Sequence, residues 1–103
     1  MRICEVNFGD EIGTRPAVII RGQGNTVDVM KITTRSKMGD YSKYRLSGLS
    51  GVRGYVVTNI IYTVTKSKIK RYTGTLFDCE RKGAIQKMNM FNRQGKLEKI
   101  IIS

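Results

Sequence analysis

Cations dominate the side chains that could do chemistry in this sequence. Nineteen Lys and Arg residues stand against eight Asp and Glu, and the formal net charge is +11. Residues 31–71 contain a single acid, Asp40, and ten basic residues: Lys31, Arg35, Lys37, Lys43, Arg45, Arg53, Lys66, Lys68, Lys70 and Arg71. Because solvated surfaces normally mix both signs, this segment predicts a surface for a polyanion, with nucleic acid as the first candidate.

Several classes of chemistry are excluded by composition. Histidine is absent, which removes histidine proton relays, histidine metal ligands and Ser-His-Asp triads. The two cysteines, Cys4 and Cys79, form no close pair of the kind that binds zinc or iron-sulfur clusters. We interpret them as buried or idle thiols in a reducing cytosol. No metal and no cofactor are therefore expected.

Targeting signals are also missing from the sequence. The N-terminus has no secretory apolar segment, and the longest apolar runs, residues 17–20 and 100–102, are far too short to cross a bilayer. We expect a cytoplasmic protein that does not associate with membranes.

Five tyrosines are interleaved with the basic residues: Tyr41, Tyr44, Tyr55, Tyr62 and Tyr72. Aromatic rings in a basic groove can stack on unpaired bases, although any single tyrosine is more often structural. The helix expected near the C-terminus balances its basic residues with acids, so it does not resemble the recognition helix of a duplex reader. A single-stranded RNA or DNA is the favoured partner.

Short strands must position most of these side chains. Apolar residues alternate or cluster in brief runs separated by Gly and polar residues, as is typical of strands. A chain of 103 residues is expected to form a single domain, residues 1–103. Strands are expected over residues 3–8, 17–20, 26–33, 41–46, 55–58, 60–64 and 97–102, with a long glycine-rich loop over 34–54 around the strand at 41–46.

One helix is expected, over residues 78–92. Asp78 is a suitable N-cap, Glu80 in the first turn suits the helix dipole, and Gly95 suits the C-terminal stop. Gly83 in its interior weakens this prediction. The predicted fold is therefore mainly β, a small curled sheet of antiparallel strands with a C-terminal helix.

Three segments, taken in order, resemble the MazF/PemK/Kid family of bacterial toxins. Residues 9–20, GDEIGTRPAVII, match the family's loop of Gly, acid and Arg-Pro before an apolar strand. Residues 32–36, ITTRS, match its Thr followed by Thr or Ser, and residues 49–69 match its segment of paired valines and a following turn. Together the three segments carry a resemblance that spans most of residues 3–90 and is moderately specific.

The resemblance implies an SH3-like barrel, usually a homodimer, that cleaves single-stranded RNA at short sequences without a metal. It also implies silencing by a cognate antitoxin protein. The family's key arginine falls on Arg15, and its hydroxyl pair falls on Thr33 and Thr34. Its loop acid falls on either Asp10 or Glu11.

Two positions depart from the family pattern. Asn59 stands where some members carry a base-like aspartate, and Val57 stands where some carry arginine. The usual Gly-Asp opening of the first strand is also missing. These departures affect the assignment of the residues that transfer protons more than they affect the predicted fold.

Cleavage of this type requires the 2′-hydroxyl to attack the adjacent phosphorus, with a base, a cation and a proton donor to the 5′ oxygen. Arg15 suits the cation role, because a guanidinium offers phosphate a rigid fork of donors. Thr33 and Thr34 are expected to hydrogen-bond a phosphate oxygen, and Asp10 or Glu11 to act as base. The residues expected to bind the RNA are Arg35, Ser36, Lys37, Lys43, Arg53 and Asn59.

Structural roles compete with these assignments. Arg15 would serve only the fold if it formed a salt bridge with Asp10 or Glu11, and the threonines would do so if they reflected β-propensity alone. The main hypothesis is a sequence-specific endoribonuclease toxin. The alternative is a non-catalytic SH3-like or OB-like module that binds single-stranded nucleic acid. A toxin-fold protein that binds a protein target is a third hypothesis.

Overall fold

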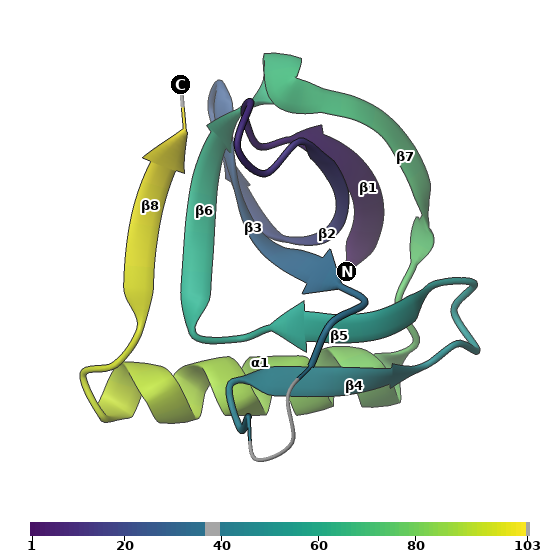
Figure 1. The fold of residues 1–103 in the computed structure, drawn as a ribbon, viewed down its shortest axis with the longest axis vertical. Helices are drawn as coiled ribbons and strands as arrows, with labels where there is room; N and C mark the ends of the chain where they lie inside the picture. The colour runs from purple at the N-terminus through teal and green to yellow at the C-terminus, as the bar shows by residue number, and fades with distance from the viewer. Residues whose placement is uncertain (37–39, 103) are drawn as a thin grey trace.

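The computed structural model describes residues 1–36 and 40–102, which form one curled sheet of eight strands and a helix across one end (Figure 1). The fold class predicted from the sequence, mainly β with a C-terminal helix, is confirmed. The elements in chain order are β1 (Arg2–Asn7), β2 (Thr14–Gln23), β3 (Thr26–Thr33), β4 (Lys43–Ser47), β5 (Arg53–Val57), β6 (Ile60–Thr65), a short 3-10 turn η1 (Lys66–Lys68), β7 (Ile69–Thr75), α1 (Asp78–Arg93) and β8 (Glu98–Ile102).

Strand β3 is the centre of the sheet. One of its edges pairs with β2, while the other pairs with β6 over its first half and with β5 over its second half. This division curls the sheet into a barrel-like form (Figure 1). The sheet does not close, since β4 and β7 end the main path of pairing. Among the described strands, the pairing of β8 with β6 is parallel and the others are antiparallel.

The curl buries both faces of the inner strands. On β1, Ile3 belongs to a first core cluster with Met30, whereas Cys4 belongs to a second cluster with Val29. Side chains along a strand alternate between faces, so β1 and β3 each supply both clusters. Cys4, Val6 and Phe8 are buried together in the second cluster, and Ile3 is buried in the first cluster on the opposite face.

Residues 40–54 of the glycine-rich segment contain more strand than the sequence predicted. The strand expected at 41–46 lies at Lys43–Ser47, and β5 begins at Arg53, inside the segment predicted as a loop. Strand β7 was not predicted. Its side chains are exposed or half-exposed along its whole length, so no apolar alternation marks it in the sequence.

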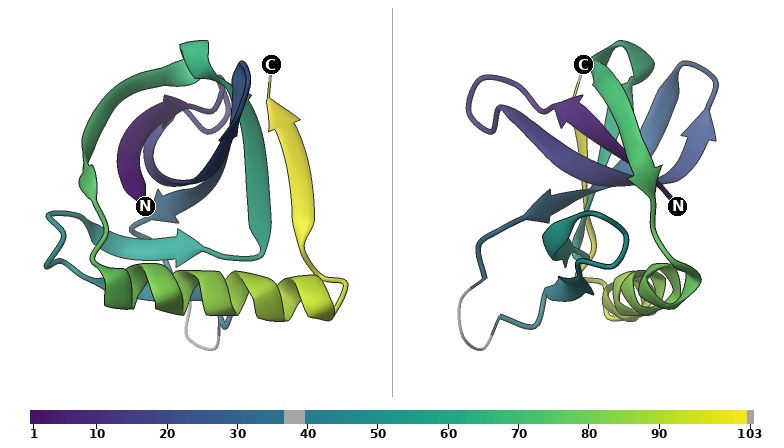
Figure 2. Two further views of the ribbon diagram at one scale, coloured as in Figure 1. Left: turned by 180° about the vertical axis from the view of Figure 1, so that it is seen from behind. Right: turned by 90° about the vertical axis from the view of Figure 1, so that its right-hand side faces the viewer.

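Helix α1 lies along β4 and β5 (Figure 2). The predicted N-cap is wrong: Phe77 occupies that position without a side-chain hydrogen bond, and Asp78 is the first helical residue. Gly95 ends the helix with φ +69°, as predicted. Gly83 is required by packing, because a Cβ there would overlap the Tyr44 ring. No helix within the described part of the chain is long and apolar enough to cross a membrane.

Glu80 joins the start of α1 to the turn between β4 and β5. Its side chain is buried, and Oε2 accepts a hydrogen bond from the backbone N–H of Ser47 at 2.8 Å. Its Oε1 accepts one from the Ser50 hydroxyl at 2.7 Å. Ser50 Oγ in turn accepts a hydrogen bond from the N–H of Phe77, at 3.1 Å. The carboxylate therefore holds the turn that leads into Arg53.

We expect Glu80→Ala to lower the free energy of unfolding by about 2 to 3 kcal/mol, because it removes the buried carboxylate that accepts hydrogen bonds from the Ser47 N–H and the Ser50 hydroxyl. Asp78→Ala is the matched control, since the Asp78 side chain is 83% exposed. It should change the free energy by less than about 0.5 kcal/mol. Urea denaturation of both variants measures the difference, and equal losses would show that the Glu80 contacts do not stabilise the fold.

Candidate active site

Strand pairing brings the predicted catalytic residues together. Ala17 on β2 lies opposite Lys31 on β3, and extending this antiparallel register by two residues places Arg15 across from Thr33. Since side chains two apart on a strand share a face, Arg15, Lys31 and Thr33 lie on one face of the sheet. The methyl group of Ala17 leaves space beside the longer Lys31 side chain.

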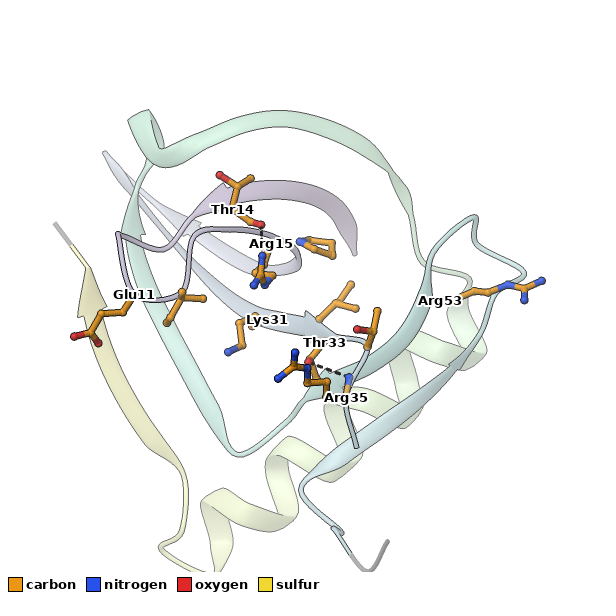
Figure 3. A pocket seen from close by; sticks show the side chains of 11 residues that line it. Glu11, Thr14, Arg15, Lys31, Thr33, Arg35 and Arg53 are labelled. Carbon is orange, nitrogen blue, oxygen red and sulfur yellow. Dashed lines mark hydrogen bonds between the residues drawn. The ribbon is translucent and has the colours of Figure 1, made fainter. Parts of the chain in front are cut away.

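These residues line a cleft of about 590 Å³. Arg15, Lys31, Thr33 and Arg35 are turned toward the same space (Figure 3). Arg53 lies at the edge of the cleft with its guanidinium pointing outward. The charged residues of the lining are four cations and one carboxylate: Arg15, Lys31, Arg35, Arg53 and Glu11. The cleft therefore suits a phosphate group.

Arg15 is exposed, and its Nη1 donates a hydrogen bond to the Thr14 carbonyl oxygen at 3.1 Å. Within residues 1–36 and 40–102, no carboxylate lies within salt-bridge distance of it. The structural alternative, a salt bridge to Asp10 or Glu11, is therefore absent from this part of the chain. The guanidinium is accessible to a ligand in the cleft.

The two threonines end β3 and begin the segment that follows it. Thr33 Oγ1 accepts a hydrogen bond from the backbone N–H of Arg35 at 3.2 Å, which orients the hydroxyl in the cleft that Thr33 lines. Thr34 also lines the cleft. Its hydroxyl and that of Thr33 can still donate to a phosphate oxygen.

The structure separates the two candidate acids. Glu11 is part of the cleft lining, whereas Asp10 lies outside it, in the exposed loop between β1 and β2. The Glu11 side chain extends from the same loop, and its carboxylate points away from Arg15 (Figure 3).

The residues predicted to bind RNA fall into several places. Arg35 and Arg53 line the cleft, while Ser36 and Lys43 line an adjoining hollow of about 570 Å³. The Lys43 ammonium lies 2.6 Å from the Asp40 carboxylate, and this contact lowers the pKa of Asp40. Lys37 lies outside the described residues.

Asn59, which was predicted to bind RNA, lies in the turn between β5 and β6. It lines neither the cleft nor the adjoining hollow. Its carbonyl oxygen accepts a hydrogen bond from the N–H of Glu98 at 2.9 Å. Its Oδ1 is buried and has no partner within the described part of the chain.

The sequence did not single out Lys31 as a residue of the site. It was one of ten basic residues in the segment 31–71. Its ammonium lies 6.0 Å from the centre of the buried Tyr62 ring. Partial burial and the neighbouring Arg15 and Lys43 lower the pKa of Lys31. The signal in the sequence was its spacing, two residues before Thr33 on the same strand face.

The tyrosines divide into structural and accessible ones. Tyr62 is buried against Phe8, with ring centres 5.0 Å apart, and Tyr44 packs against the first core cluster. Tyr41 and Tyr72 are the exposed members, and the Arg2 guanidinium lies 3.7 Å above the Tyr72 ring. Within the described residues there is no group of three or more His, Cys, Asp or Glu arranged to hold a metal ion.

Comparison with known families identifies the family of this chain. The sequence matches a family described as "PemK-like, MazF-like toxin of type II toxin-antitoxin system" over residues 1–94. The chain belongs to the PemK/MazF toxin family. PemK/MazF toxins are endoribonucleases, so the family and the enzyme class expected from the resemblance are confirmed. None of the curated proteins matches the sequence significantly.

Solved structures share the PemK/MazF fold with this chain. MazE-MazF from Deinococcus radiodurans superposes with a TM-score of 0.73 at 18% identity, covering 89% of this chain and 92% of that one. The Mycobacterium tuberculosis toxin MazF-mt6 gives 0.72 at 18% identity, with 89% and 97% covered. An endoribonuclease with its cognate antitoxin from a mycobacterial species gives 0.71 at 16% identity, with 91% and 89% covered.

Proposed function

We propose that this chain is a sequence-specific, metal-independent endoribonuclease that cleaves single-stranded RNA by attack of the 2′-hydroxyl on the adjacent phosphorus. The observation that carries the proposal is the convergence of Arg15, Lys31, Thr33 and Arg35 in one open cleft (Figure 3). Family membership supports the same reaction class. Single-stranded RNA suits the site because the attacking hydroxyl must rotate into line with the leaving oxygen.

Arg15 stabilises the charge that develops on the phosphorus. Its guanidinium can donate two parallel hydrogen bonds to the non-bridging oxygens, and these strengthen as the phosphorane forms. This contribution needs no metal ion. The hydroxyls of Thr33 and Thr34 supply further donors, held by the end of β3.

Glu11 is the acid that we assign as the base for the 2′-hydroxyl. It lines the cleft, whereas Asp10 does not. Because its carboxylate points away from Arg15 (Figure 3), the side chain must rotate toward the cleft when RNA binds. Glu11 is exposed in a loop, so its side chain can rotate without displacing packed neighbours.

Incubation of the purified protein with a long single-stranded RNA in EDTA tests this function. We expect discrete fragments ending in a 2′,3′-cyclic phosphate, because the 2′-oxygen becomes bonded to phosphorus. A gel shift with intact RNA would instead indicate a non-catalytic binding module. Cleavage that disappears in EDTA and returns with a divalent cation would contradict metal independence.

We also propose that the protein acts in the cytoplasm as a homodimer and is silenced by a cognate antitoxin. The net charge of +11 favours an acidic partner segment. Expression of the chain should arrest bacterial growth, and co-expression of an acidic antitoxin should relieve the arrest. Growth arrest that persists in an Arg15→Ala strain would separate the toxicity from RNA cleavage.

A further inference from the structure

We propose that Lys31 is the proton donor to the 5′ oxygen that leaves when the RNA strand is cut. The inference rests on the proposed function and deepens it by naming the general acid. The family resemblance assigned no role to this lysine. The assignment depends on its position in the cleft, on the groups beside it and on the absence of a better donor among the described lining residues.

The position of Lys31 follows from the β2–β3 pairing. Its Cα partner is Ala17, one of the smallest residues that could stand there, and Thr33 lies two residues along on the same face. The Lys31 ammonium is directed into the space that Arg15 and Arg35 also face (Figure 3). A phosphate bound between Arg15 and Thr33 therefore has the Lys31 ammonium beside it.

Other cleft residues are poor proton donors to a leaving oxygen. Guanidinium groups such as Arg15 and Arg35 keep their protons at neutral pH, so they stabilise charge without transferring a proton. Threonine hydroxyls are much weaker acids than an ammonium. Glu11 is the carboxylate in the lining, and it is needed in its ionised form as the base. Lys31 remains as the group that can release a proton and recover it from water.

The surroundings make Lys31 a stronger acid than an ordinary lysine. Partial burial disfavours its charged form, and the positive charges of Arg15 on β2 and Lys43 on β4 add to this effect, so its pKa is lowered. The other facing groups are Arg35, which follows β3, and the Tyr62 ring on β6. A general acid works best when its pKa approaches the working pH, which is the direction of this shift.

Two proton transfers accompany the cleavage. The 2′-oxygen forms a bond to phosphorus as its proton passes to the Glu11 carboxylate. The bond between phosphorus and the 5′ oxygen then breaks, and its electron pair stays on the 5′ oxygen. That oxygen takes a proton from the Lys31 ammonium. The products are a 2′,3′-cyclic phosphate, a 5′-hydroxyl, a protonated Glu11 and a neutral Lys31 amine. Glu11 then gives its proton to water and the Lys31 amine takes one from water, which restores both side chains.

Two variants and a modified substrate test the assignment. Lys31→Met keeps most of the side-chain length but has no proton to give, and Lys31→Arg keeps the charge but holds its protons. Both should cut ordinary RNA about 10²-fold more slowly than the parent. Lys82→Met, an exposed lysine on α1, is the matched control and should cut at the parent rate. Thermal unfolding checks that each variant is folded.

The decisive comparison uses an oligonucleotide with sulfur in place of the 5′ oxygen at the cleaved linkage. A thiolate leaves without protonation, so the loss caused by either Lys31 substitution should largely disappear on this substrate. The parent rate on ordinary RNA should also fall at alkaline pH, at a lower pH than the titration of an ordinary lysine, and Lys31→Arg should lack this fall.

The possible failures are distinguishable. If the parent protein does not cut ordinary RNA, the proposed function itself is wrong. If the parent cuts but Lys31→Arg is equally active, the lysine supplies only charge. If both variants lose as much activity on the sulfur substrate as on ordinary RNA, Lys31 binds RNA without donating the proton, and this inference alone is overturned.

Discussion

Arg15→Ala should lower the rate of RNA cleavage by about 10³-fold, because it removes the main group that stabilises the charge on the phosphorane. The fold should be almost unaffected. Arg15 is exposed, and within the described residues its side chain donates a hydrogen bond only to the neighbouring Thr14 carbonyl oxygen. Its removal should therefore change the free energy of unfolding by less than about 0.5 kcal/mol. Single-turnover cleavage and urea denaturation measure the two effects separately.

Two further variants define what Arg15 contributes. Arg93→Ala removes an exposed charge at the end of α1, and it should leave the cleavage rate unchanged. Arg15→Lys keeps the charge but loses the planar fork of donors, so it should lie closer to Arg15→Ala than to the parent protein. An Arg15→Ala protein that cuts at the parent rate would remove Arg15 from the mechanism.

Gly54→Ala should damage both stability and activity. Gly54 has φ +121°, and a Cβ there would lie 2.5 Å from the Thr33 carbonyl oxygen and 3.2 Å from its carbonyl carbon. The obstacle is backbone, so β5 and the end of β3 must separate. We expect a loss of about 3 to 5 kcal/mol in the free energy of unfolding. Because Thr33 moves with its carbonyl, cleavage should also fall at temperatures where the variant is still folded.

Gly51→Ala is the matched control for the backbone strain. Gly51 has φ +84°, and a Cβ there would meet nothing within 4 Å. Its cost should be about 1 to 2 kcal/mol, from the left-handed conformation alone. Cleavage by the folded Gly51→Ala protein should remain at the parent rate. If the two alanine variants are equally stable and equally active, the contact between Gly54 and Thr33 has no role in placing the site.

Much of the fold was predictable from local apolar patterns. Strand β3 has the predicted bounds, since Val27, Val29, Met30 and Ile32 are buried on its two faces. Strand β7 was not predictable in this way, because it has no buried side chain. The role of Gly83 was also hidden in the sequence. Its contact with the Tyr44 ring joins α1 to β4, and only the tertiary structure shows it.

The site was predictable in part. The resemblance named Arg15, Thr33 and Thr34, and the structure places all three in one cleft. Glu80 lies in the first turn of α1, as predicted. The sequence did not reveal that its side chain is buried and accepts a hydrogen bond from the N–H of Ser47. Lys31 lies in the cleft because strand pairing places it opposite Ala17. Strand register is set by pairing partners and turns, so composition alone could not reveal it.

The hairpin of β2 and β3 has a consequence for folding. Arg15, Lys31 and Thr33 all lie on this hairpin, whose strands are joined by the short connection between Gln23 and Thr26. Closing such a short loop costs little chain entropy and can happen early, whereas β1 can meet β7 only after most of the chain has been synthesised and brought back. We therefore expect that, when the outer strands fray on heating, Arg15, Lys31 and Thr33 stay aligned on the β2–β3 hairpin.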